Sequence, residues 1–124
     1  EVAEGRDGRG LEFAFVDPII KKPGKDRYAA GDEIVLEWAP HPGAAKYFVQ
    51  IYAKPDPDGW SNDTLFPWSG RPEVTEPRFA LKGIGVPLKP GFFYQLEVHA
   101  SDEQGRMLSE TARTYADYDF EIVE

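Results

Sequence analysis

Residues 88–100 read Leu-Lys-Pro-Gly-Phe-Phe-Tyr-Gln-Leu-Glu-Val-His-Ala, and this stretch decides the fold. After the Pro90-Gly91 pair, every second residue suits a protein core: Tyr94, Leu96, Val98 and Ala100. Most of the residues between them are polar, and a period of two predicts a β-strand with one buried face. Because proline fixes φ and glycine permits a positive φ, the pair predicts a turn directly before the strand.

Tyr94 falls near the start of this strand, on the side that we expect to be buried. Its ring can pack in the core while its hydroxyl group returns to the backbone just upstream, an arrangement known as a tyrosine corner. The presence of Leu88, Pro90 and Gly91 just before it favours the corner over an ordinary core tyrosine that follows a turn.

The pattern Leu88-x-Pro90-Gly91-x-x-Tyr94, followed by alternation, resembles the corner between strands E and F of fibronectin type III domains. Trp38 and Tyr47 are similar to two further landmarks of that family, the strand B tryptophan and the strand C tyrosine. The resemblance covers about residues 11 to 123. It implies an all-β, antiparallel two-sheet sandwich of about seven strands, fibronectin type III-like or immunoglobulin-like. The chain departs from the family in its long segment before the corner, which leaves the strand count open.

Length and composition fit one globular domain. The 124 residues suffice to bury about two-thirds of the unfolded surface in one core. We expect residues 1–10 to be a flexible lead-in or linker and residues 11–124 to form the β-sandwich.

The chain has no cysteine, which excludes disulfides, thiolate zinc sites and cysteine nucleophiles. A net charge of −8 argues against nucleic acid or an anionic membrane surface as partner.

Further strands are expected where apolar residues alternate, at residues 11–16, 33–38, 45–53, 78–81 and 118–123, with a short one at 64–68. Trp38 falls on the core side of its strand. In the 45–53 strand, Tyr47 points inward, whereas Phe48 and Tyr52 point outward together with Gln50. Two outward aromatic residues are more than solvent exposure usually favours.

The segment 54–76 is rich in proline and glycine and contains Trp60 and Trp68. Long irregular segments of this kind are often functional, or they cover a sheet. Because Phe48, Tyr52 and Phe93 are expected on the outer face of one sheet, three hypotheses arise. The tryptophans pack on that face as a satellite core; the aromatic patch docks a neighbouring domain or protein; or an exposed indole stacks on sugar rings. Polar residues expected to flank such a sugar platform are Asp58, Asn62, Asp63 and Gln50.

No catalytic constellation is evident. The two histidines, His41 and His99, lie in a proline-rich loop and at an outward strand position, and no Gly-x-Ser-x-Gly motif occurs. We therefore expect neither enzymatic activity nor a cofactor. Asp56, Asp58 and Asp63 are candidates for a calcium loop, but the EF-hand spacing fails, which favours a solvated acidic turn. Asn62-Asp63-Thr64 matches the N-glycosylation pattern.

The sequence thus predicts a non-catalytic module that acts as a spacer or protein-interaction domain. The alternative is a carbohydrate-binding module that uses exposed tryptophan or tyrosine residues. The chain does not begin with Met and shows no signal peptide, so we expect a processed product or a piece of a longer, extracytoplasmic protein. The expected partners are neighbouring domains, another protein or a glycan. No apolar run approaches the roughly 20 residues of a membrane span.

Overall fold

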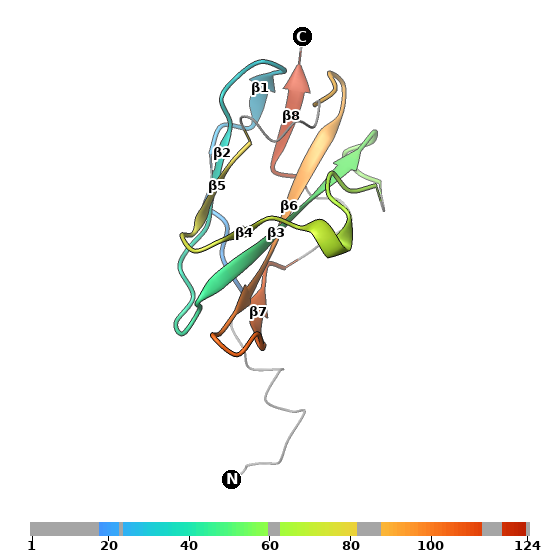
Figure 1. Cartoon of the computed structure of the whole chain (residues 1–124). Helices are drawn as coiled ribbons and strands as arrows, with labels where there is room; N and C mark the ends of the chain where they lie inside the picture. Colours follow the sequence, from blue (N-terminus) through green and yellow to red (C-terminus); the bar gives the residue numbers. More distant parts are fainter. Residues whose placement is uncertain (1–17, 23, 60–62, 82–87, 113–117, 124) are drawn as a thin grey trace.

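The computed structural model describes residues 18–22, 24–59, 63–81, 88–112 and 118–123 and shows an all-β chain with two sheets (Figure 1). The strands are β1 (Arg27–Ala29), β2 (Val35–Glu37), β3 (Lys46–Lys54), β4 (Glu73–Val74), β5 (Arg78–Ala80), β6 (Phe93–Ser101), β7 (Met107–Glu110) and β8 (Phe120–Val123). A 3-10 turn, η2, spans Trp68–Gly70. In these ranges no helix has the length and apolar character needed to cross a membrane.

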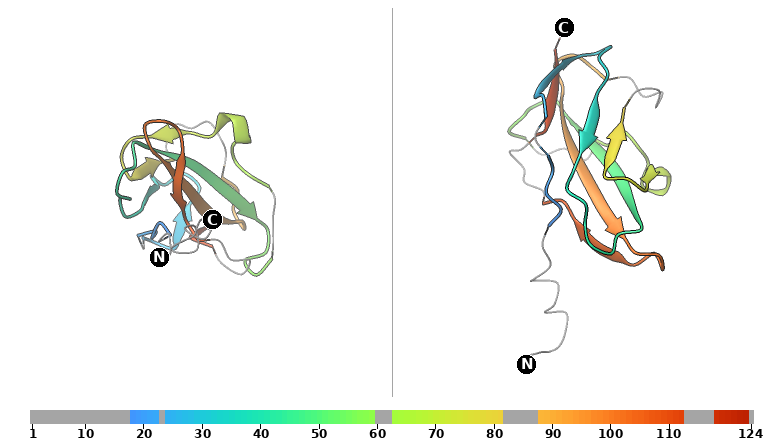
Figure 2. Two further views of the ribbon diagram at one scale, coloured as in Figure 1. Left: turned by 90° about the horizontal axis from the view of Figure 1, so that it is seen from below. Right: turned by 90° about the vertical axis from the view of Figure 1, so that its left-hand side faces the viewer.

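The two sheets form two layers, with β2 and β5 in front of the long β3 and β6 in the right-hand view of Figure 2. The larger sheet has the order β1-β8-β6-β3-β4, and β7 also pairs with β6. Because β3 pairs with β6 along its whole length, β7 and β8 share the opposite edge of β6. They follow one another along that side of β6, and β1 pairs with the far side of β8.

The prediction of a purely antiparallel sandwich is wrong for one pair, because β1 runs parallel to β8. The chain before β1 crosses between the sheets. Ile19 bridges Thr111 beside the larger sheet, and Lys21 then bridges Trp38 next to the smaller sheet. β1 and β8 are far apart in sequence, so no short hairpin connects them. A short hairpin would require antiparallel pairing, and without one β1 can pair in parallel with β8.

Several expected elements lie where the alternation predicts them, although β2 and β5 are shorter than the predicted 33–38 and 78–81 strands. The predicted 64–68 strand is reduced to an isolated bridge between Tyr52 and Thr64. The short strands β1 and β4 have no counterpart in the predicted pattern. The predicted 11–16 strand, the 1–10 lead-in, Trp60 and Asn62 lie outside the described residues.

The core lies between the sheets and centres on the inward faces of β3 and β6. Trp38 is fully buried and meets Tyr47 edge-on, with ring centroids 5.5 Å apart. The Tyr47 hydroxyl accepts a hydrogen bond from the His41 backbone N–H at 3.0 Å. Trp38 and Tyr47 therefore tie the smaller sheet to the centre of the larger one.

The turn before β6 has the geometry of a tyrosine corner. The Tyr94 hydroxyl accepts a hydrogen bond from the Lys89 backbone N–H at 2.9 Å, and the Tyr94 ring stacks on Phe120 at 5.3 Å. Gly91 has φ +88°, a conformation in which a side chain would be strained. Leu88 packs against the core beside this turn. Ring burial and hydroxyl pairing together fix where β6 begins.

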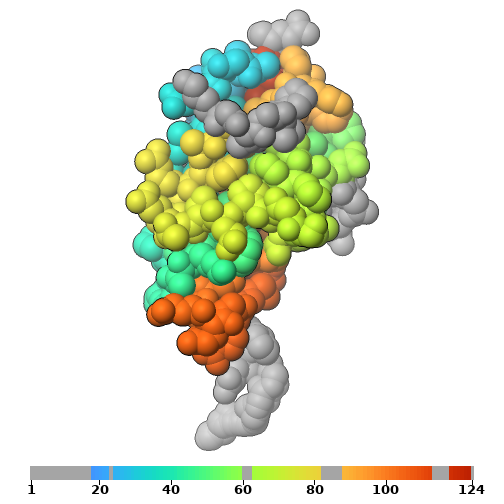
Figure 3. Space-filling view, in the orientation of Figure 1, coloured from blue at the N-terminus to red at the C-terminus, as the bar shows by residue number. Residues whose placement is uncertain are grey.

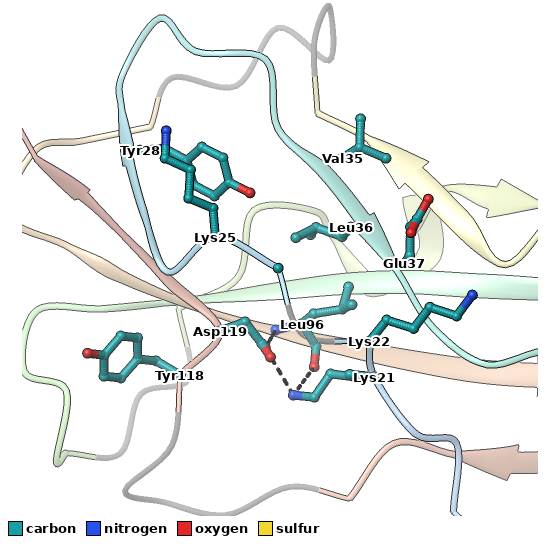
Figure 4. A pocket seen from close by; sticks show the side chains of 11 residues that line it. Lys21, Lys22, Lys25, Tyr28, Val35, Leu36, Glu37, Leu96, Tyr118 and Asp119 are labelled. Carbon is teal, nitrogen blue, oxygen red and sulfur yellow. Dashed lines mark hydrogen bonds and ion pairs between the residues drawn. The ribbon is translucent and has the colours of Figure 1, made fainter.

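Between β7 and β8, the middle of β6 has no strand partner on this side among the described residues. The Leu96 backbone N–H donates to Asp119 Oδ2 at 2.7 Å, so a carboxylate replaces the strand carbonyl that is missing there. Lys21 Nζ donates to the same oxygen at 2.9 Å and to the Leu96 carbonyl oxygen at 3.2 Å. The Lys21 side chain is only 17% exposed, and its ammonium group completes the hydrogen bonding at this position (Figure 4).

We expect Tyr94→Phe to lower the free energy of unfolding by about 1–3 kcal/mol, because the Lys89 N–H loses its buried acceptor. Urea denaturation measures this change. Tyr28→Phe is a matched control: Tyr28 also packs on Phe120, but its hydroxyl makes no hydrogen bond within the described ranges. Equal stability of Tyr94→Phe and the wild type would remove the corner from the account.

Candidate functional site

The outer face of the larger sheet carries the candidate site. Along β3 it presents Phe48, Gln50 and Tyr52, and along β6 it presents Glu97 and His99. The register pairs Phe48 with His99 and Gln50 with Glu97 across the two strands. Strand periodicity thus brings an aromatic ring, an amide, a carboxylate and an imidazole onto one patch of sheet.

Residues 63–72 run back along the free edge of β3. The Ala53 N–H donates to the Asp63 carbonyl at 2.9 Å, the Leu65 N–H donates to the Ile51 carbonyl at 2.9 Å, and the Val49 N–H donates to the Pro72 carbonyl at 3.0 Å. We call residues 63–72 the cover segment. Figure 3 shows residues 63–80, in yellow-green and yellow, as a band across the middle of the side of the molecule that faces the viewer.

Gln50 holds the middle of the cover segment, where regular pairing with β3 stops. Its Nε2 donates to the Phe66 carbonyl oxygen at 2.9 Å, and its Oε1 accepts from the Phe66 N–H at 3.3 Å and from the Ile51 N–H at 3.1 Å. The side-chain amide therefore acts as an extra peptide group. It satisfies backbone groups that a continuous strand would have paired.

Because of the cover segment, two side chains that were predicted to be exposed on the outer face are buried. Gln50 and Tyr52 point to the outer face as predicted, but they are buried, at 1% and 4% exposed. Gln50 is bonded to the cover segment, and Tyr52 donates its hydroxyl proton to Glu97 Oε1 at 3.2 Å. Neither side chain is accessible to a partner or to a sugar in this arrangement.

Trp68 projects from η2 and is 53% exposed. Its ring stacks on His99 with centroids 6.5 Å apart, and the Arg71 guanidinium lies 4.8 Å from its centroid. The same guanidinium lies 5.2 Å from the centroid of Phe48. We call Phe48, Trp68, Arg71 and His99 the Trp68 surface. An indole that is supported in this way by a cation and a flat imidazole is held in place with about half of it open.

Three chemically active side chains converge beside the Trp68 surface. His99 Nε2 lies 3.1 Å from Glu110 Oε1 and 3.6 Å from Glu97 Oε1. Neither contact is a hydrogen bond: the one to Glu97 is too long and the one to Glu110 lacks the direction, so the buried Nε2 atom has no hydrogen-bond partner in the described part of the chain. The other ring nitrogen, Nδ1, lies 3.1 Å from Arg71 Nη1.

The proton position on His99 follows from its neighbour. A guanidinium carries only donors and does not deprotonate in proteins, so Nδ1 must accept from Arg71. The neutral imidazole then carries its proton on Nε2, the atom that faces the two carboxylates. Protonated His99 would have two donor nitrogens and would repel Arg71.

Glu110 is brought opposite His99 by the β6–β7 hairpin. Asp102 Oδ1 accepts from the backbone N–H groups of Gln104 and Arg106 at 3.0 and 2.9 Å, and Asp102 Oδ2 accepts from Arg106 Nε at 2.9 Å. The Arg106 backbone N–H, followed by its side chain, holds the pKa of the Asp102 carboxyl group below its ordinary value. The hairpin thus sets the register that places Glu110 at the site.

The remaining predicted site residues lie elsewhere. Phe93 is on the same face but packs on Tyr118, with centroids 4.9 Å apart, and not on a tryptophan. Asp56 and Asp58 form a local turn in which Asp56 Oδ1 accepts from the Asp58 N–H at 3.0 Å. The three calcium candidates, with Asp63, do not form a group of converging ligand atoms among the described residues.

Sequence reasoning missed Arg71, Glu97 and Glu110 as members of the site. Strand parity already placed Glu97 and His99 on one face, two residues apart. The position of Glu110 depends on the hairpin register, and that of Arg71 depends on the path of the cover segment. Neither of these is encoded in a local pattern.

A pocket of about 220 Å³ lies on the other side of the larger sheet, near Lys21, Tyr28, Leu96 and Tyr118 (Figure 4). Its central ammonium group, on Lys21, is already paired with Asp119 and the Leu96 carbonyl. We therefore assign this pocket a structural role, at the place where the chain before β1 passes between the two sheets. We place the candidate functional site on the outer face of the larger sheet.

Comparison with known proteins finds no match: no family model matches the chain, and neither does a curated protein or a solved structure. The site is therefore interpreted from its own geometry.

We expect Gln50→Leu to lower the free energy of unfolding by about 2–4 kcal/mol, because the Ile51 and Phe66 N–H groups lose their shared acceptor. Urea denaturation measures this change. Gln104→Leu, at an exposed hairpin position, is the matched control and should change stability by less than about 0.5 kcal/mol. Equal effects of the two substitutions would contradict the assigned role of Gln50.

Asp102 should titrate below its ordinary value of 3.8 in an NMR pH titration. Because the folded pKa is lower than the unfolded one, the carboxylate favours folding above about pH 4, and this contribution disappears as pH falls through the folded pKa. Arg106→Ala should raise the pKa only part of the way, since the backbone N–H remains. A wild-type midpoint at or above 3.8 would refute the assignment.

Proposed function

We propose that this chain is a non-catalytic, fibronectin type III-like module that binds a neighbouring domain or another protein through the Trp68 surface. The observation that carries the proposal is the half-exposed Trp68, held against His99 and Arg71. Tryptophan and arginine are the residues most enriched among the dominant contacts of protein interfaces. The Trp68 indole is not part of the core, so core stability does not explain why a tryptophan occupies this position.

The pre-ordering of the surface supports the proposal. Arg71 Nε donates to the Trp68 carbonyl oxygen at 3.2 Å, and Arg71 contacts the rings of Trp68 and Phe48. Side chains that are already fixed lose less conformational entropy when a partner binds. Lys46, which lies over Phe48 and pairs with Glu73, extends the polar rim. An aromatic centre with a charged rim matches the usual anatomy of an interface.

The fibronectin type III likeness is supported by the tyrosine corner at Tyr94 and by the packing of Trp38 on Tyr47. Modules of this kind commonly occur in series within larger proteins, outside the cytoplasm. The proposal therefore includes a longer, extracytoplasmic parent protein with neighbouring domains as the first class of partner.

A carbohydrate ligand is the second candidate, and the open indole of Trp68 favours it. A sugar platform also needs polar groups beside the ring. Of those expected from the sequence, Gln50 is buried and Asp58 lies in the turn after β3. The cation beside Trp68, Arg71, can donate to sugar hydroxyl groups. Protein binding is the first candidate because it uses the aromatic and cationic groups together.

Photo-crosslinking tests the proposal on the longest native form of the protein, in the cells that produce it. A benzophenone amino acid at Ser69, an exposed position next to Trp68, should give a discrete cross-linked product with a protein that mass spectrometry identifies, and adding Trp68→Ala should remove that product. Met107, which is 53% exposed, provides the control position. No product from position 69, or the same product from position 107, would contradict the proposal.

We expect Trp68→Ala to weaken binding of that partner by at least about 2 kcal/mol, roughly thirtyfold, if Trp68 is the central contact. Stability should change by less than about 1 kcal/mol, because the side chain is half exposed. Titration calorimetry and urea denaturation measure the two quantities. A glycan array on the same two proteins separates the candidates: glycan binding that is lost in Trp68→Ala would replace the first candidate by the second.

A further inference from the structure

We propose that Glu97, His99 and Glu110 form a binding site for one divalent transition-metal ion of the zinc type. The proposal goes beyond the partner-binding function: Glu97 and Glu110 lie outside the Trp68 surface, and only His99 belongs to both. His99 and Glu97 stand two residues apart on β6, and Glu110 is the direct cross-strand partner of His99 on β7. All three ligands therefore come from paired strands.

The ligand atoms have the spacing that a metal ion requires. The three atoms lie within 4.8 Å of one another, with Nε2 of His99 3.1 Å from Glu110 and 3.6 Å from Glu97. Zinc bonds of about 2.0–2.2 Å in tetrahedral geometry separate neighbouring ligands by roughly 3.4 Å. An ion fits among these atoms with small side-chain adjustments, and it has one coordination position left for water or a partner group.

Two buried polar groups at the site need a counterpart. The Nε2 atom of His99 is buried, and it has no hydrogen-bond partner in the ranges that the structure covers. The Glu97 side chain is nine-tenths buried, and its hydrogen bond from the neutral Tyr52 hydroxyl is long, at 3.2 Å. Burying a carboxylate with so little compensation is costly. A dication between them would satisfy both groups.

The donor set selects the class of metal. One imidazole nitrogen and two carboxylate oxygens suit zinc, cobalt, nickel or copper ions. Calcium and magnesium prefer six or more oxygen ligands, which this site does not provide. Glu110, with a side chain 53% exposed, gives the ion a route from solvent.

Arg71 competes with the metal. Coordination at Nε2 requires the imidazole proton to sit on Nδ1, where it would face the Arg71 guanidinium donor 3.1 Å away. Metal binding should therefore release Arg71 from His99, and removing Arg71 should strengthen metal binding. An adventitious surface histidine would not show this behaviour, so Arg71 supplies a test of the particular geometry.

The experiment titrates the whole chain with Co²⁺, followed by its visible absorption, and with Zn²⁺ in a calorimeter. The wild type should bind one ion per chain. Glu110→Gln should weaken binding by at least about tenfold. Substituting residues that only hydrogen-bond to metal ligands already lowers metal affinity by that factor, and Glu110 is itself a proposed ligand. Glu103→Gln, an exposed carboxylate on the same hairpin, and His41→Ala, the other histidine, should leave the affinity unchanged.

Arg71→Ala should tighten Co²⁺ binding by roughly threefold to tenfold, since a positive charge close to the ion is removed. Circular dichroism without metal checks that each variant is folded; Glu110 is exposed and Arg71 is half-buried, so neither substitution removes a core side chain. No binding by the wild type below about 1 mM metal would overturn the proposal. Loss of binding in His41→Ala, or equal affinities of wild type and Glu110→Gln, would also overturn it.

Discussion

The pairing of β3 with β6 is the constraint on which the rest of the structure depends. Nine residue pairs, from Lys46–Ser101 to Lys54–Phe93, fix one register. The same register places the core residues on the inner face and brings Phe48 against His99 on the outer face. Because side chains alternate, a slip by one residue would exchange the two faces. The tyrosine corner reinforces this register by fixing where β6 begins, so the corner contributes to the position of the site as well as to stability.

Backbone pairing is interrupted on both sides of the central β3–β6 pair, and side chains replace the missing backbone partners. On the β3 edge, the Gln50 amide pairs with Phe66 where the cover segment leaves the strand. On the β6 edge, the Asp119 carboxylate accepts from Leu96 and is itself held by Lys21. Each interruption changes what the surface presents. The break in the cover segment allows residues 68–71 to bulge outward, and this bulge exposes an indole and places a guanidinium over the outer face.

Local patterns in the sequence predicted the parts of the fold that depend on local geometry. The Pro90-Gly91 turn, the alternation of β3 and β6 and the inward position of Trp38 follow from periodicity and backbone preference. The parallel pairing of β1 and the burial of Gln50 depend on segments that meet from distant parts of the chain. The site divides in the same way: Phe48, Trp68 and the face of His99 could be predicted, whereas Arg71 and Glu110 required the tertiary path and the hairpin register.

The cover segment pairs with the edge of β3, so that Gln50 and Tyr52 are buried while Trp68 stays half exposed. Amide hydrogen exchange measured by NMR tests this pairing most directly. The Val49, Ile51 and Ala53 N–H groups bond to the cover segment or to Gln50, whereas the alternating amides of β3 face β6. The account predicts that both sets exchange slowly and to a similar degree. Fast exchange of Val49, Ile51 and Ala53 beside slow exchange of the alternating amides would mean that the edge of β3 is uncovered, and would contradict the account.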